Sequence, residues 1–126
     1  MVVEASKQKA KTLKKPAIDV VLEWFKTKQW DPFPFQKKTW SAHAKGESGL
    51  IHAPTGTGKT YAAWAGPLIE WMDELGKKPM PKRPPELRVL WITPLRALVK
   101  DTTHSLRTLV EDLQLPWTVE ERTGDT

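Results

Sequence analysis

The chain has 126 residues, a formal net charge of +5 and no cysteine, which excludes disulfide bonds and allows for one small domain. There is no secretory signal, and no apolar run approaches the roughly eighteen residues that a membrane span requires. His43, His52 and His104 lack the spacing of metal ligands, so we expect no intrinsic metal site. These features predict a soluble, cytoplasmic protein without a membrane partner.

The N-terminal region, residues 1–15, is rich in lysine and poor in apolar side chains, with five lysines against the single Glu4. It predicts a disordered basic arm, which either contacts nucleic-acid phosphates nonspecifically or is a solvated tail without a function. Residues 16–126 form the predicted folded part. Its first element is a helix from Ala17 to Lys28. An apolar stripe supports this helix and consists of Val20, Val21, Trp24 and Phe25.

After this helix, residues 30–34 break the helical periodicity with Pro32 and Pro34. A second short helix is predicted from Phe35 to Ala44. Gly46 stands where a glycine can end that helix, because glycine adopts the left-handed conformation without steric cost.

The most informative segment is the octapeptide Ala53-Pro54-Thr55-Gly56-Thr57-Gly58-Lys59-Thr60. It follows a short apolar run of strand character, residues 49–53, and precedes a segment with helical periodicity. A glycine-rich turn between strand and helix that ends in lysine and a hydroxyl has the form of a phosphate-binding loop. The alternative is a surface turn before a helix, with Lys59 merely solvated.

Each residue type in this loop has a separate role in binding a nucleoside triphosphate. Gly56 and Gly58 let backbone N–H groups approach phosphate oxygens, and the N-terminus of the following helix favours negative charge there. Lys59 adds a positive charge that reaches the β- and γ-phosphates. The Thr60 hydroxyl is placed to coordinate Mg²⁺. Lys59 and Thr60 are therefore the candidate catalytic residues, and Thr60 is the candidate metal ligand.

The helix behind the loop is predicted to run to Leu75 and to bury one apolar face. Gly66-Pro67 should kink or break it, because proline removes an N–H group and crowds Ala63. Residues 76–85 contain four prolines and four basic residues and predict an exposed connection. We interpret their charge as serving solubility.

The C-terminal third continues the alternation of strands and helices. A strand is predicted at residues 87–93, a helix from Leu95 to Leu113, and a third strand at residues 117–120. Strands that alternate with helices predict βαβ units, an α/β fold with a parallel sheet, and a ligand site at the carboxyl ends of the strands.

Four segments resemble the motifs of superfamily 2 helicases, in the order of that superfamily. Residues 30–36, Trp-Asp-Pro-Phe-Pro-Phe-Gln, resemble a Q motif. Residues 53–60 resemble motif I, because Ala53 stands where the general phosphate-binding loop has glycine. Pro94-Leu95-Arg96-Ala97-Leu98 resembles motif Ia, and residues 122–126, Arg-Thr-Gly-Asp-Thr, resemble the motif Ib region. The combination is most similar to the Lhr-type, ligase-associated DEXH-box helicases of bacteria.

The resemblance implies a RecA-like P-loop NTPase domain preceded by short N-terminal helices, with ATP and Mg²⁺ as cofactors. It implies that Gln36 reads the adenine edge and that a nearby aromatic residue packs on the base. Which aromatic residue does so is open, since Trp30 lies closer to Gln36 than the stacking residue of DEAD-box proteins does. The implied ATP-binding residues are Gln36, Ala53, Pro54, Thr55, Gly56, Thr57, Gly58, Lys59 and Thr60. The implied nucleic-acid-binding residues are Pro94, Leu95, Arg96, Gly124 and Asp125.

The resemblance also implies an activity, DNA-dependent ATP hydrolysis with 3′-to-5′ movement on single-stranded DNA, with a DNA/RNA hybrid as a further substrate. The implied setting is bacterial, nucleoid-associated DNA repair, in association with a DNA ligase and a nuclease.

The two RecA-like domains of such helicases are each longer than this chain. We therefore expect residues 16–126 to be a truncated, N-terminal portion of the first domain. Asp73-Glu74 does not fit an Asp-Glu-x-His box, so this segment alone is expected not to turn over ATP. A P-loop small-molecule kinase and a catalytically inactive nucleic-acid-binding module remain as alternatives.

Overall fold

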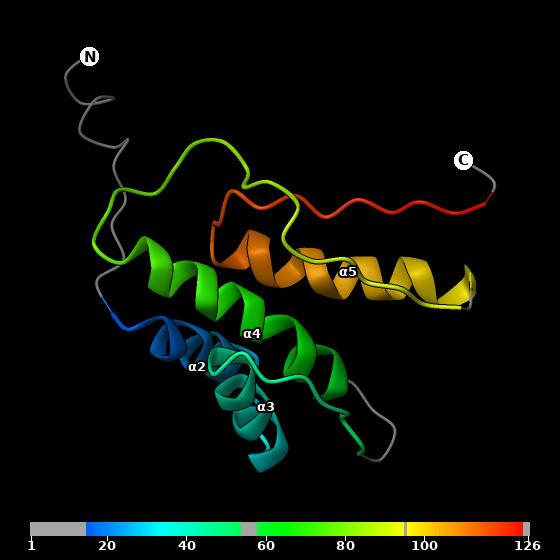
Figure 1. The fold of residues 1–126 in the computed structure, drawn as a ribbon, viewed down its shortest axis with the longest axis horizontal. Helices are drawn as coiled ribbons and strands as arrows, with labels where there is room; N and C mark the ends of the chain where they lie inside the picture. Colours follow the sequence, from blue (N-terminus) through cyan, green and yellow to red (C-terminus); the bar gives the residue numbers. More distant parts are fainter. Residues whose placement is uncertain (1–14, 54–57, 95, 125–126) are drawn as a thin grey trace.

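The structure is a computed structural model that describes residues 15–53, 58–94 and 96–124, without the side chains of residues 96–98. Within these ranges the chain forms four helices, which are α2 (Ala17–Thr27), α3 (Pro34–Ala44), α4 (Gly58–Leu75) and α5 (Arg96–Asp112). Figure 1 shows α4 between the pair α2 and α3 on one side and α5 on the other. The predicted basic arm lies outside the described residues, apart from Lys15.

The four predicted helices are confirmed, with bounds that differ by no more than a residue at each described end. The stop at Gly46 is also confirmed. Its φ is +76°, and its N–H donates to the carbonyl of His43 at 2.9 Å, while the Glu47 N–H donates to Ala42 at 3.0 Å. These bonds satisfy carbonyl groups at the end of α3 that would otherwise lack a partner.

Of the kink or break that we predicted at Gly66-Pro67, the break is wrong, because α4 continues through Pro67 to Leu75, and the kink stays a prediction. Burial on both sides of the proline explains this result. Ala65 and Leu68 are fully buried, and His43 of α3 fills the space at Gly66, where a Cβ would meet its ring at 3.1 Å. Packing against α3 therefore offsets the hydrogen bond that proline removes.

Helix α4 is the centre of the core, and tryptophan side chains connect it to its neighbours. The indole Trp64 Nε1 donates to the carbonyl of Leu106 in α5 at 3.1 Å, and Trp40 Nε1 in α3 donates to the carbonyl of Tyr61 at 3.0 Å. Both indoles are buried. These tryptophans therefore contribute to packing and satisfy their polar edge inside the fold.

The three strands that we predicted at residues 49–53, 87–93 and 117–120 are not formed in the described part of the chain. Figure 1 shows the second and third as elongated traces beside α5, and a groove of about 560 Å³ lies between them. Leu87, Leu90 and Ile92 are each more than three-quarters exposed. A strand exists only when its backbone pairs with a neighbour, and no backbone hydrogen bond joins these two segments. The parallel sheet stays a prediction.

Candidate nucleotide-binding site

The candidate phosphate site lies at the start of α4, where Gly58, Lys59 and Thr60 form the first turn and are partly buried. The first N–H groups of a helix have no partner within the helix, and the positive end of its dipole is at the same place. Ala53 is partly buried just before this turn. The predicted residues Pro54, Thr55, Gly56 and Thr57 lie outside the described residues.

The Lys59 ammonium has no hydrogen bond or ion pair to any other described residue. Other lysines of the chain do have such partners, as Lys28 has in Asp112 at 3.1 Å. A partly buried cation at a helix N-terminus adds to a positive field that favours a phosphate group. The described residues therefore fit the triphosphate of a nucleotide.

Gln36 connects the predicted Q-motif region to this turn. The residue is 2% exposed. Gln36 Oε1 accepts the N–H of Phe33 at 2.8 Å, and Gln36 Nε2 donates to the carbonyl of Gly58 at 3.0 Å. The amide thus caps the start of α3 and holds it against the start of α4. Both of its polar atoms are engaged by backbone groups in this structure.

Two phenylalanines flank the same glycine. The rings of Phe33 and Phe35 are stacked, with centroids 5.7 Å apart and planes 12° apart. A Cβ at Gly58 would lie 3.1 Å from Phe35 Cζ and 3.4 Å from Phe33 Cδ2. Phe33 is 55% exposed. Sequence reasoning missed this pair, although the alternation Phe-Pro-Phe before Gln36 was the available signal.

Trp30, the other aromatic candidate for base stacking, packs into the aromatic core cluster. Its ring lies 5.6 Å from that of Trp24, 6.0 Å from that of Phe25 and 5.7 Å from that of Tyr61. The structure therefore brings Phe33, Gln36 and Gly58 together, while Trp30 lies against Trp24, Phe25 and Tyr61 and is 40% exposed.

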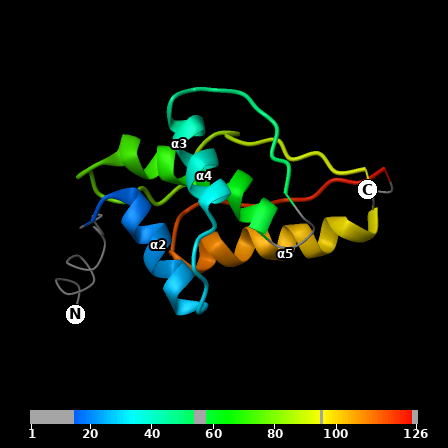
Figure 2. The same cartoon turned by 90° about the horizontal axis from the view of Figure 1, so that it is seen from below.

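Three of the predicted nucleic-acid residues, Pro94, Arg96 and Gly124, have a described backbone. Pro94 and Gly124 are exposed, and Arg96 begins α5. The start of α5 and the C-terminal part of the described chain lie at the same end in both Figure 1 and Figure 2. Leu95 and Asp125 lie outside the described residues, as does the side chain of Arg96.

We also asked whether acidic and histidine side chains could hold a metal ion near this site. In the ranges that the structure describes, His, Asp and Glu side chains form no group of three that could hold a metal ion. Thr60 thus stays the predicted contact for a Mg²⁺ that arrives with the nucleotide.

The groove between residues 87–92 and 117–122 is lined by none of the candidate nucleotide residues, so we do not assign it to ATP.

The length and apolar character of the described helices decide whether any of them could span a membrane. Across residues 15–53, 58–94 and 96–124, no helix combines the length and apolar character needed to cross a bilayer.

Comparison with known proteins adds an independent observation to this geometry. The family described as DEAD/DEAH box helicase matches residues 33–126, which include the last four residues of the Q-motif region, the phosphate-binding loop and the start of α5. The chain belongs to the DEAD/DEAH box helicase family. Members of this family have a RecA-like fold, which supports the predicted α/β class. Helix α2 lies before the matched residues in the chain.

Individual helicases are similar to the chain over most of its length. The "Lhr helicase/ probable uracil glycosylase" of Mycolicibacterium smegmatis is 40% identical over 116 residues, which is 82% of this chain and 7% of that protein. The "ATP-dependent helicase Lhr-Core protein 2" of Thermococcus barophilus is 35% identical over 96 residues, 76% of this chain and 11% of that protein. The "Nucleolar RNA helicase 2-A" of Xenopus laevis is 36% identical over 84 residues, 66% of this chain and 10% of that protein.

These similarities confirm the predicted resemblance to Lhr-type helicases and favour a helicase over a small-molecule kinase. The chain spans only about a tenth or less of the relatives that it matches. No solved structure matches the chain significantly.

Proposed function

We propose that this chain is the ATP-binding part of an ATP-dependent superfamily 2 helicase that translocates on DNA in repair. The observation that carries the proposal is the first turn of α4, where Lys59, which has no partner among the described residues, lies beside Thr60 in a helicase-family segment. Because the matched relatives are at least about six times as long as this chain by the shares given above, we assign the activity to a longer protein with two RecA-like domains.

In this proposal the nucleotide phosphates bind residues 53–60. Lys59 contacts the β- and γ-phosphates, backbone N–H groups of the loop surround them, and the Thr60 hydroxyl is a ligand of the bound Mg²⁺. The metal ion supplies charge neutralisation for the transferred phosphoryl group. A parallel sheet, completed by other parts of the longer protein, would support the loop from behind.

For the base, we propose that adenine stacks on the exposed ring of Phe33. The stacked Phe35 backs that ring and contacts the position of Gly58, so the platform is held at the start of the phosphate-binding helix. Gln36 reads the adenine edge with the hydrogen-bonding capacity that its two backbone contacts leave, since an amide has two N–H donors and two lone pairs on oxygen.

For the nucleic acid, we propose phosphate contacts from the start of α5 and from the region of Gly124. The N-terminus of α5 offers free N–H groups, and Arg96 adds charge to the same contact. Such contacts read no base sequence, which suits a motor that tracks along a strand. Single-stranded DNA or a DNA/RNA hybrid is the proposed ligand, and a DNA ligase and a nuclease are the proposed partners in the bacterial nucleoid.

The experiment that tests this function measures phosphate release from ATP by the full-length helicase, with and without single-stranded DNA. We expect DNA to raise the turnover rate at least about tenfold, because nucleic-acid binding completes the catalytic cleft. Single-stranded RNA in a parallel titration measures which nucleic acid is preferred. Turnover that no DNA or RNA changes, or transfer of the phosphate to a small acceptor instead of water, would count against the helicase.

A further inference from the structure

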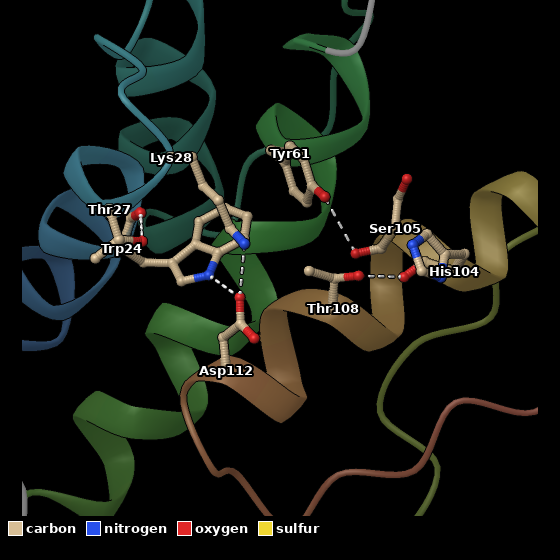
Figure 3. Close-up of polar contacts among 8 residues, drawn as sticks. All are labelled: Trp24, Thr27, Lys28, Tyr61, His104, Ser105, Thr108 and Asp112. Carbon is tan, nitrogen blue, oxygen red and sulfur yellow. Dashed lines mark hydrogen bonds and ion pairs between the residues drawn. The ribbon is translucent and has the colours of Figure 1, made fainter.

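Tyr61 connects the helix of the nucleotide site to the helix of the proposed nucleic-acid site. It follows Thr60 directly in α4, and its hydroxyl donates to the carbonyl of Ser105 in α5 at 3.2 Å, as Figure 3 shows. The side chain is buried. Burial raises the pKa of the Tyr61 hydroxyl above its ordinary value, so the group stays protonated and remains a hydrogen-bond donor.

A second donor, one turn further along α4, strengthens this link. Trp64 Nε1 donates to the carbonyl of Leu106, the residue after Ser105. Both acceptors are backbone carbonyls, so the link holds the helix α5 itself and does not depend on a mobile side chain. A carbonyl oxygen has two lone pairs and can accept such a bond in addition to its bond within the helix.

The distance between Ser105 and the start of α5 decides how a shift of α4 would affect the start of α5. Ser105 lies nine residues after Arg96, so the start of α5 is about 14 Å away along the helix axis, at 1.5 Å per residue. A helix of this length is stiff over that distance. Displacement of the first turn of α4 would therefore move the start of α5.

The opposite end of α5 is held by a different contact. Trp24 Nε1 of α2 donates to Asp112 Oδ2 at 2.8 Å, and Lys28 Nζ lies 3.1 Å from the same oxygen (Figure 3). The hydrogen bond from Trp24, followed by that from Lys28, lowers the pKa of the Asp112 carboxyl below its usual value. The ring of Trp24 also lies edge-on to the ring of Tyr61, with centroids 5.1 Å apart, so this contact is not independent of α4. Arg107 of α5 provides the control instead, because its guanidinium donates to the carbonyl of Val119 at 2.7 and 3.0 Å, outside α4.

We infer that Tyr61 is a positioning residue that couples nucleotide binding at the start of α4 to nucleic-acid binding at the start of α5. The inference rests on the proposed function. A triphosphate contacted by Lys59 and Thr60 fixes the first turn of α4, and the hydroxyl of Tyr61 transmits that position to the carbonyl of Ser105. Nucleotide and nucleic acid then favour the same arrangement of the two helices, and the coupling is reciprocal.

The test uses Tyr61→Phe in the full-length helicase, a change that removes one oxygen and keeps the buried ring. The affinity for fluorescent single-stranded DNA is measured with and without a nonhydrolysable ATP analogue, and the ratio of the two dissociation constants is the coupling factor. We expect the wild-type factor to fall by about fivefold or more in the variant, within the usual range of coupling between sites. Trp64→Phe, which removes the second donor, should lower the factor in the same direction and serves if Tyr61→Phe fails to fold.

Arg107→Lys is the control. It keeps the positive charge and weakens the two hydrogen bonds to the carbonyl of Val119, which lie outside α4, so it should leave the coupling factor unchanged. An unchanged factor in Tyr61→Phe, or an equal fall in Arg107→Lys, would overturn the role of Tyr61. A wild-type protein that binds DNA and the ATP analogue independently would contradict the proposed function as well, and this outcome is visible before any variant is compared.

Discussion

We expect the replacement of Lys59 with alanine in the full-length helicase to remove nearly all ATP hydrolysis and to leave the fold intact. The ammonium has no partner among the described residues, so its loss leaves no buried group among them unsatisfied. Its charge is at the N-terminus of α4, where the proposed site must stabilise the developing charge on the phosphates. Loss of a preorganised electrostatic contact of this kind typically costs about a hundredfold to a thousandfold in turnover.

Steady-state phosphate release measures this effect, with circular dichroism as the check on folding. Lys37→Ala is the matched control, because Lys37 is an exposed lysine of α3 and should leave turnover within about twofold of wild type, as expected for surface substitutions. Turnover by Lys59→Ala close to the wild-type rate would show that the phosphate-binding role is assigned to the wrong residue.

Trp64→Ala should destabilise the fold more than any change at the protein surface. Its ring is 3% exposed and lies edge-on to the rings of Trp91 and Trp117, and its indole N–H bonds the carbonyl of Leu106. Truncation leaves a cavity between α4 and α5 and costs about 3–5 kcal/mol. That loss is a large part of the roughly 5–15 kcal/mol that stabilises a typical domain.

Urea unfolding of the chain, followed by far-UV circular dichroism, measures this loss as a shift of the midpoint. Trp30→Ala is the control, because that ring is 40% exposed and its removal opens a smaller cavity. Equal midpoints for the two variants would mean that the contact between α4 and α5 contributes little to stability.

The helices could be predicted from the sequence because each combines an apolar stripe with a local stop signal. Gly46 ends α3 with a positive φ. In α4 the buried residues Trp64, Leu68 and Trp71 are spaced by about one helical turn. The break expected at Pro67 was wrong, because propensity describes an isolated helix and His43 packs against the glycine beside that proline. Local signals therefore located the helices, while contacts between them decided whether α4 continued.

The strands could not be verified in the same way, because a strand depends on partners distant in sequence. Val89 and Trp91 pack against the core, whereas Leu90 and Ile92 are exposed, so the predicted alternation is present without the pairing. The candidate nucleotide site was predicted from its loop residues, and their role stays a prediction. The Phe33 and Phe35 pair was not, because stacking at Gly58 requires α3 and α4 to be brought together.

The central proposal, that the ATP site of this chain drives movement on a nucleic-acid strand, is tested most directly by strand displacement. The full-length helicase is mixed with a short DNA duplex that carries a single-stranded 3′ tail and a fluorescent label on the displaced strand. We predict displacement that requires ATP and Mg²⁺, is lost in Lys59→Ala, and does not occur on a duplex with a 5′ tail. Failure to displace a strand from any tailed DNA or DNA/RNA duplex, or displacement that proceeds without ATP, would contradict the proposal.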